Sequence, residues 1–164
     1  MEIKFRGKPC NLLKEPIQLQ QELDFIAVNL ELNDFKLSDL KNKKKIISIA
    51  PSLDTEICAL QTKVLNDKIK ELQDISLITI TLDLPFAQSR SCENYKDNDN
   101  HIIVSDYKYH DFANKTGLLI KELGLLARSI IVCDENNKIK YIDINEEISS
   151  EPNYEKLINF IENN

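Results

Sequence analysis

Tryptophan is absent from the 164 residues, methionine occurs once, and glycine occurs only three times. Three scattered glycines cannot build the glycine-rich loop that cradles a phosphate, which excludes the usual nucleotide-dependent enzymes. The longest apolar runs fall far short of the roughly 20 residues that span a bilayer, and the first residues lack the apolar core of a signal peptide. We therefore expect a cytoplasmic protein that neither crosses a membrane nor carries a targeting segment.

The charge balance excludes further classes of partner. The formal net charge is −6, whereas nucleic acids and anionic membranes select for a basic face. One basic run, Lys41–Lys45, is interrupted by Asn42 and is expected to form a solvated turn before a strand. Only two histidines are present, and no two cysteines have the close spacing of a zinc knuckle, so we expect neither a metal nor a cofactor.

The chain contains no repeat, low-complexity tract or linker, and we expect a single domain over residues 1–164. Apolar and β-branched runs predict strands over residues 3–5, 10–13, 17–19, 27–30, 46–50, 75–82, 102–104, 129–133 and 139–144. Helical periodicity and capping residues predict a helix that starts at Asp54 or Thr55 and has apolar residues from Ile57 to Leu72, a short helix from Asp83-Leu84-Pro85 through Cys92, and helices over 111–116 and 154–162, the last with Ile158 and Ile161 facing inward. This order predicts an α/β fold, a thioredoxin-like sandwich with a mixed central sheet flanked by helices and an N-terminal β-hairpin extension.

Four cysteines are available for chemistry: Cys10, Cys58, Cys92 and Cys133. In a reducing compartment a cysteine is more often buried, metal-bound or catalytic than part of a permanent disulfide framework. Cys133 lies in an apolar run and is expected in the core, whereas Cys10 follows a turn and is expected to be partly exposed.

The segment Pro51-Ser-Leu-Asp-Thr-Glu-Ile-Cys58 combines the features of a reactive thiol. A strand ends at Pro51, which would limit the access of water, and Cys58 falls in the first turn of the next helix. There the unpaired N–H groups and the helix dipole favour the thiolate, which is the form that attacks. Thr55 precedes the cysteine by three residues, so its hydroxyl lies on the same helix face. The acidic Glu56 is expected to point to solvent.

Arg128 is the best candidate for a cation beside this thiolate. It stands at the entry to an apolar strand, where a charge is costly unless it has a partner. Each residue also has a purely structural interpretation: Cys58 as a small buried hydrophobe, Thr55 as a helix cap and Arg128 as half of a surface ion pair. Their occurrence on one strand-turn-helix unit and one adjacent strand favours the functional interpretation.

Three segments together resemble one family; they are Ala50-Pro-Ser-Leu-Asp-Thr-Glu-Ile-Cys58, Asp83-Leu-Pro-Phe-Ala-Gln-Ser-Arg-Ser-Cys92 and Leu126-Ala-Arg-Ser129. They are similar to segments of the bacterial thiol peroxidases, an atypical two-cysteine branch of the peroxiredoxins. The proline–threonine–cysteine pattern is typical of peroxiredoxins in general, and the Leu-Pro-Phe-Ala-Gln-Ser-Arg run before a second cysteine is specific to this branch. The resemblance extends over nearly the whole chain.

The resemblance implies a role for each matching residue: Cys58 as the peroxidatic cysteine, Cys92 as the resolving cysteine, Thr55 and Arg128 as the residues that hold peroxide and thiolate, and Pro51 as the shielding proline. It implies reduction of hydrogen peroxide and organic hydroperoxides through a sulfenic acid on Cys58 and an intrachain Cys58–Cys92 disulfide. Thioredoxin is the implied reductant, and a homodimer is the implied assembly.

The two cysteines belong to neighbouring predicted helices, because a predicted strand separates them in the sequence. A disulfide requires Cα atoms within about 7 Å. We therefore expect the helix that ends at Cys92 to unwind locally at each turnover. The alternative is that Cys92 is a spare exposed thiol.

Two other functions remain open. A redox sensor would use the same two cysteines but pass the oxidation to a protein partner; Thr55 and Arg128, which rapid peroxide turnover requires, favour the enzyme. A disulfide oxidoreductase of the thioredoxin kind requires a C-x-x-C pair at the start of the helix, and the residues that follow Cys58 contain no second cysteine.

Overall fold

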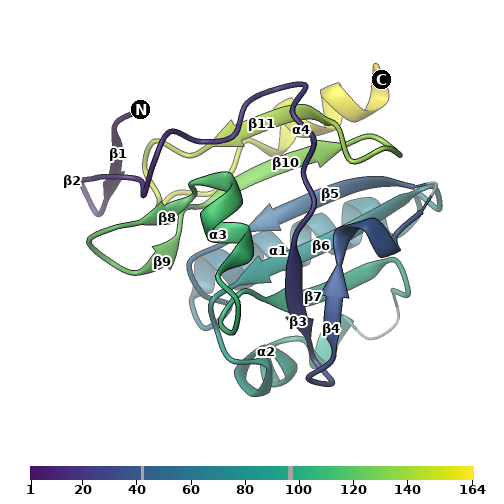
Figure 1. The fold of residues 1–164 in the computed structure, drawn as a ribbon. Helices are drawn as coiled ribbons and strands as arrows, with labels where there is room; N and C mark the ends of the chain where they lie inside the picture. The colour runs from purple at the N-terminus through teal and green to yellow at the C-terminus, as the bar shows by residue number, and fades with distance from the viewer. Residues whose placement is uncertain (42, 96–97) are drawn as a thin grey trace.

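The computed structural model describes residues 1–41, 43–95 and 98–164 (Figure 1). These residues form a seven-stranded sheet in the order β11-β10-β5-β6-β7-β3-β4. β5, β6 and β7 run parallel to one another, and the remaining neighbours pair antiparallel. The strands of this sheet are β3 (Ile26–Asn29), β4 (Asp34–Lys36), β5 (Lys44–Ile49), β6 (Ile75–Thr81), β7 (His101–Ser105), β10 (Ser129–Cys133) and β11 (Ile139–Ile144).

Two short antiparallel pairs complete the described strands: β1 (Ile3–Phe5) with β2 (Lys8–Cys10), and β8 (Leu119–Ile120) with β9 (Leu125–Leu126). The helices are α1 (Glu56–Ile69), α2 (Pro85–Ser91), α3 (Asp111–Thr116) and α4 (Tyr154–Glu162), with 3₁₀ turns η1 (Leu37–Asp39) and η2 (Glu93–Tyr95). Within the described ranges, no helix has the length and apolar character needed to span a membrane.

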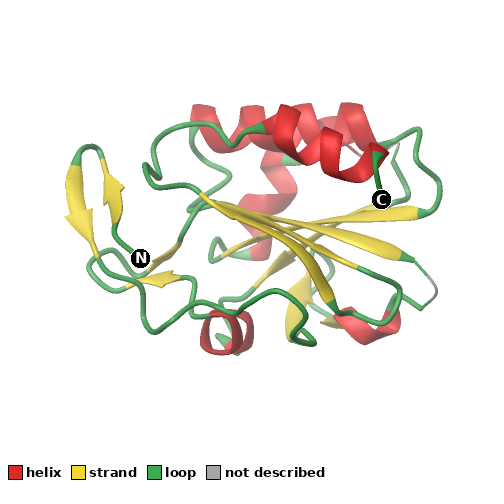
Figure 2. Ribbon diagram, turned by 90° about the horizontal axis from the view of Figure 1, so that it is seen from above, coloured by secondary structure: helices red, strands yellow, loops and turns green. Residues whose placement is uncertain are grey.

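Helices cover both faces of the sheet (Figure 2). On one face, Leu65 of α1 and Leu157 of α4 pack in a cluster with Ile46 of β5. On the opposite face, Phe112 of α3 belongs to a second cluster with Ile47, the next residue of β5. Successive residues of a strand point to opposite faces, so a central parallel strand covered on both sides is a continuous apolar run. This burial explains why the central strands are recognisable in the sequence.

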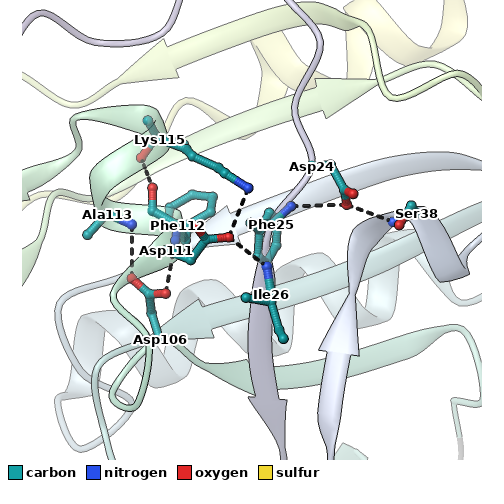
Figure 3. Close-up of polar contacts among 10 residues, drawn as sticks. Asp24, Phe25, Ile26, Ser38, Asp106, Asp111, Phe112, Ala113 and Lys115 are labelled. Atoms are coloured by element: carbon teal, nitrogen blue, oxygen red, sulfur yellow. Dashed lines mark hydrogen bonds and ion pairs between the residues drawn. The ribbon is translucent and has the colours of Figure 1, made fainter.

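A buried carboxylate attaches α3 to the sheet (Figure 3). The two carboxylate oxygens of Asp106 accept hydrogen bonds from the backbone N–H groups of Phe112 (3.0 Å) and Ala113 (2.9 Å), at the start of the helix. Asp111 in turn accepts a hydrogen bond from the N–H of Ile26 in β3 at 2.9 Å. Burial raises the pKa of Asp106, and its two hydrogen bonds oppose that shift. The carboxylate of Asp106 therefore caps α3, although the N-cap position itself is occupied by His110.

The predicted thioredoxin-like sandwich, with its mixed sheet and N-terminal strand pair, is confirmed. The bounds of α3, α4, β10 and β11 agree with those predicted. The strand predicted over residues 10–13 is wrong, since β2 ends at Cys10. Residues 17–19 form no strand, because the N–H of Ile17 donates to Thr116 and that of Gln20 to Ile139, two separate parts of the fold.

The inward faces of α1 and α4 differ from the apolar pattern of the sequence. Leu60 is 41% exposed, and Leu72 lies beyond the end of α1 and is 37% exposed. In α4, Ile158 is only partly buried, whereas Ile161, also partly buried, packs against the core as predicted. The side chains that are buried instead are Gln61, Thr62 and Asn66 in α1 and Leu157 in α4. The polar ones are accommodated because each makes hydrogen bonds inside the protein.

Two predictions of exposure are wrong. Lys45 is not part of a solvated turn: it lies in β5, is 1% exposed, and its Nζ donates to the carbonyl oxygen of Glu135 at 3.2 Å. Burial lowers the pKa of Lys45. Asn42, which interrupts the basic run, lies outside the described residues. Cys10 is buried rather than partly exposed, with 7% of its surface accessible.

Candidate active site

Cys58 lies where β5 passes into α1. The strand ends at Ile49, and Pro51 follows as a buried residue of the turn. Thr55 is the N-cap of α1, with extended backbone angles (φ −128°, ψ 150°), and its Oγ1 accepts a hydrogen bond from the N–H of Cys58 at 3.3 Å. The cysteine is therefore in the first turn of the helix, where the dipole favours a negative charge.

Arg128, the residue immediately before β10, contacts the same thiol. It is 2% exposed, so its interpretation as half of a surface ion pair is wrong. Its Nη2 donates to Sγ of Cys58 at 3.1 Å, its Nη1 to Oε1 of Gln61 at 2.6 Å, and its Nε to the carbonyl oxygen of Ile148 at 2.8 Å. Three acceptors, two in α1 and one after β11, fix the plane of the guanidinium with Nη2 beside the sulfur.

Gln61 is a site residue that the sequence pattern does not single out. Its Oε1 accepts the hydrogen bond from Arg128, and its Nε2 donates to Oγ of Ser48 (2.8 Å) and to the carbonyl oxygen of Ile49 (3.4 Å). Gln61 is fully buried. The available signal was its spacing, because a polar residue three positions after Cys58 lies on the same inward helix face.

A cavity of about 290 Å³ opens beside the thiol. Its polar lining includes Thr55, Cys58 and Arg128, and its apolar lining includes Phe5 of β1, Pro51, Ile57 and Leu125 of β9. The cavity thus combines a thiol, a hydroxyl and a guanidinium with an apolar wall, an arrangement suited to a small polar group that carries an apolar substituent.

The N-terminal strand pair is fixed in place over this cavity. Its turn, Arg6-Gly7, has backbone φ angles of 51° and 76°, a left-handed conformation that glycine adopts readily. The carboxylate of Glu147 accepts hydrogen bonds from the N–H groups of Arg6 (3.0 Å) and Gly7 (2.9 Å). Hydrogen bonds from Ser149, together with these two, lower the pKa of Glu147 to about 2. The clamp holds Phe5 against the thiol pocket.

Cys92 is the C-cap residue of α2 and lies in a different environment. It is 4% exposed and packs with Leu53 and Ile103. Burial, together with the negative charge of Asp83, raises the pKa of the Cys92 thiol to about 12. The interpretation of Cys92 as a spare exposed thiol is therefore wrong. All four cysteines are free thiols in this structure, so Cys58 and Cys92 are not yet joined.

Asp83 is not the cap of α2. Leu84 occupies the N-cap position, and Pro85 is the first helical residue. The carboxylate of Asp83 instead accepts hydrogen bonds from the hydroxyl of Ser52 (2.7 Å) and the N–H of Leu53 (2.7 Å), in the loop that precedes α1. The sequence pattern predicted a helix cap at Asp83 and gave no sign of its contact with the loop before α1.

His101 is a structural residue of β7. Its Nδ1 lies 3.0 Å from Oδ1 of Asn66, and its Nε2 lies 2.9 Å from Oγ1 of Thr79. Burial lowers the pKa of His101 to about 4, so the ring is neutral at pH 7. Across the part of the chain that the structure describes, no group of three or more His, Cys, Asp or Glu side chains is arranged to hold a metal ion.

The Redoxin family model matches residues 18–158 of the chain. A thiol peroxidase of Streptococcus parasanguinis is 41% identical over 155 residues, which are 94% of each chain. A thiol peroxidase of Bacillus subtilis is 40% identical over 158 residues, covering 96% of this chain and 94% of the relative. The chain belongs to the thiol peroxidases of the redoxin family. The resemblance inferred from the three sequence segments is thereby confirmed.

A solved structure supports the same membership through the fold. A peroxiredoxin-like protein from Aquifex aeolicus superimposes with a TM-score of 0.90 at 28% identity, covering 99% of this chain and 96% of the other. The similarity therefore includes the N-terminal strand pair and α4 as well as the central sheet.

Proposed function

We propose that this thiol peroxidase reduces hydrogen peroxide and organic hydroperoxides with Cys58 as the attacking thiolate. The observation that carries the proposal is the 3.1 Å hydrogen bond from Nη2 of Arg128 to Sγ of Cys58, formed by an arginine that is 2% exposed. A buried guanidinium places its positive charge beside the sulfur, where little solvent screens it, and the thiolate is the form of cysteine that attacks. The adjoining cavity admits the peroxide.

In the first step, the sulfur of Cys58 attacks one oxygen of the peroxide and the O–O bond breaks. The other oxygen leaves with the bonding electron pair, takes up a proton, and departs as water or an alcohol. The sulfur loses two electrons and keeps one oxygen as a sulfenic acid. Arg128 donates to the departing oxygen and stabilises its charge, and Thr55 does the same once its hydroxyl turns away from the carbonyl oxygen of Ser52. Pro51 limits the access of water.

In the second step, Cys92 attacks the sulfenic acid, so that an S–S bond forms and the sulfenic oxygen leaves as water. The structure holds Cys92 against Leu53 and Ile103, and not against the Cys58 thiol. Because a disulfide requires Cα atoms within about 7 Å, the segment that ends α2 unwinds before the bond forms. The intrachain disulfide is then reduced by two electrons from an external dithiol.

Thioredoxin is the dithiol that we propose, in the cytoplasm, where the free thiols of the resting enzyme are maintained. We also propose a homodimer. Leu84 and Phe86, at the start of α2, are 51% and 65% exposed, and large apolar side chains that protrude together favour a contact with another protein surface. Light scattering on the purified protein measures the mass and distinguishes the dimer from a monomer.

Peptide mapping tests the assignment of the two cysteines. The reduced protein is treated with one equivalent of hydrogen peroxide, alkylated, and digested without reduction. The expected product is a disulfide that links the peptides of Cys58 and Cys92, while Cys10 and Cys133 stay reduced and are therefore found alkylated. In the Cys92→Ser variant, a sulfenic-acid probe labels Cys58. Oxidation that appears first at Cys10 or Cys133 would contradict the proposal.

A further inference from the structure

Asp83 lies after the end of β6, between the loop that leads into α1 and helix α2. Toward the loop, its Oδ1 accepts a hydrogen bond from the hydroxyl of Ser52 at 2.7 Å, and its Oδ2 accepts one from the N–H of Leu53 at 2.7 Å. The same loop ends at Thr55, whose hydroxyl donates to the carbonyl oxygen of Ser52 at 3.3 Å. The carboxylate therefore fixes the backbone that sets the position of the Thr55 side chain.

Toward α2, the hydrogen bonds continue through Thr81. Its hydroxyl donates to Oδ2 of Asp83 at 2.8 Å and accepts a hydrogen bond from Nε2 of Gln88 at 3.0 Å. Nε2 of Gln88 also donates to the carbonyl oxygen of Val104 at 2.8 Å. Thr81 and Gln88 are both fully buried. The backbone carbonyl of Gln88 accepts the N–H of Cys92 at 3.0 Å, so a continuous chain of bonds runs from the loop to the end of α2.

Leu53 provides a second connection to the same cysteine. Its side chain packs in one cluster with Cys92 and Ile103, and its N–H is held by Asp83. While it is buried there, Cys92 is a neutral thiol with a raised pKa, and a neutral thiol is a poor nucleophile. Cys92 therefore has to leave this cluster before it reacts. Asp83 is bonded directly to Leu53 and, through Thr81 and Gln88, to α2.

We propose that Asp83 is a positioning residue that acts in opposite directions on the two half-reactions. By fixing the loop that carries Thr55, it speeds the attack of Cys58 on peroxide. By holding Leu53 directly and α2 through Thr81 and Gln88, it slows the release of Cys92 and hence disulfide formation. The inference rests on the proposed roles of Cys58 and Cys92.

Asp83→Asn is the principal test. The amide keeps the size of the side chain but replaces one acceptor oxygen with an NH₂ donor, so three donors compete for one acceptor atom. We expect the peroxide step to slow about tenfold and disulfide formation to speed up about tenfold, since the net contribution of a hydrogen bond to a charged group corresponds to an effect of about tenfold or more. Asp74→Asn is the matched control, an exposed aspartate just before β6.

Two further variants separate the branches of the network. Ser52→Ala removes one hydrogen bond between the loop and the carboxylate of Asp83. It leaves the bonds through Thr81 and Gln88 in place, so we expect the peroxide step to slow and disulfide formation to keep its rate. Gln88→Met removes the bonds to Thr81 and Val104, so we expect only disulfide formation to accelerate. Methionine suits this position because Oε1 of Gln88 is buried without a hydrogen-bond partner among the described residues, and its loss leaves no donor unpaired.

Rapid mixing measures the two steps separately. Peroxide consumption in the Cys92→Ser background reports the first step, and alkylation with mass spectrometry at timed quench points reports disulfide formation with Cys92 present. A third readout is the fraction of Cys58 converted to sulfinic acid by excess peroxide, which falls when resolution is faster. We expect loss of a residue that only supports the fold to slow both steps, so a faster disulfide step distinguishes a positioning role from a merely structural one.

Opposite changes in the two rates for Asp83→Asn, with single changes for Ser52→Ala and Gln88→Met, support the inference. Changes of the same sign in both rates, or rates equal to those of Asp74→Asn, overturn it and leave the proposed function intact. If the parent Cys92→Ser protein consumes no peroxide, the proposed function is wrong, and the inference is overturned with it.

Discussion

Arg128 and Cys58 are joined by a hydrogen bond of 3.1 Å across 70 positions of the sequence, and both are buried. The contact requires two segments to meet, since the cysteine comes from the first turn of α1 and the arginine immediately precedes β10, and Gln61 fixes the arginine from the next turn of α1. The geometry of one sulfur therefore depends on the whole sandwich.

Replacing Arg128 with lysine keeps the charge and removes the planar fork. One ammonium cannot bond to Gln61, Ile148 and the sulfur of Cys58 with the same geometry. We expect the rate of peroxide reduction in the Cys92→Ser background to fall about 100-fold or more, the usual effect of removing a preorganised donor. Arg90→Lys, on the exposed side of α2, is the control and keeps the parental rate. A fall of less than about threefold for Arg128→Lys would show that charge alone suffices.

Thr55 has a structural and a chemical role that substitution can separate. Thr55→Val removes the cap of α1 and is expected to cost about 1 kcal/mol of unfolding free energy, and it also removes the hydroxyl donor beside the peroxide. Asn153→Ala removes the side-chain cap of α4, so it lowers stability by a similar amount with unchanged peroxide reduction. Thr55→Ser restores both properties. Denaturant unfolding and single-turnover peroxide consumption are the measurements. Equal activity of Thr55→Val and Asn153→Ala would contradict the chemical role.

Phe5 forms part of the apolar wall of the cavity and comes from the clamped N-terminal hairpin. Phe5→Ser removes apolar contact for a bulky substituent but not for hydrogen peroxide. A loss of about 1 kcal/mol of apolar contact corresponds to an about fivefold fall in kcat/KM. We therefore expect an about fivefold fall for cumene hydroperoxide and less than twofold for hydrogen peroxide. Equal falls for both substrates would show that Phe5 supports the fold and does not select substrate.

His101 makes stability depend on pH below neutrality. Burial lowers its pKa from 6.5 to about 4, so the unfolded chain binds a proton between these values while the folded protein does not. The contribution to stability is therefore complete above pH 6.5 and declines as the pH falls toward 4, by an amount on the order of 3 kcal/mol. Replacement by glutamine removes this contribution. Asp106 and Glu147, whose pKa values are also shifted, are present in both proteins, so their effects on stability cancel in the comparison.

Urea unfolding at pH 7, 5.5 and 4.5 measures the effect as the difference between wild type and His101→Gln. We expect that difference to shrink as the pH falls. A difference that stays constant with pH would contradict the assignment of a neutral, buried imidazole.

Local patterns in the sequence were sufficient for much of the fold. β10, β11, α3 and α4 were predicted with their observed bounds because each is a run of clear period closed by a turn or a cap. The two-residue strands β8 and β9 were missed, since their pairing depends on residues brought together by the rest of the fold. The single domain stays a prediction; a core cluster that extends from Ile3 to Ile148 supports it.

The site was predictable where the chemistry lies in a short motif. Thr55 and Cys58 are neighbours on one turn, and the structure adds Arg128 to them, although the roles of all three stay predictions. Gln61 was missed although its spacing from Cys58 was an available signal, and Asp83 was missed because its sequence context predicts a helix cap and not a contact with the loop before α1. Polar residues on the inward face of α1 were unexpected, since hydrogen bonds that permit their burial come from other elements.

Peroxide turnover coupled to thioredoxin and thioredoxin reductase tests the central claim most directly, with wild type, Cys58→Ser, Cys92→Ser and Cys10→Ala compared. Cys10 is a buried cysteine without an assigned role, and its replacement is the control. The account predicts continuous turnover for wild type and Cys10→Ala, none for Cys58→Ser, and about one equivalent of peroxide consumed by Cys92→Ser before the reaction stops. Wild-type turnover by Cys58→Ser would contradict it.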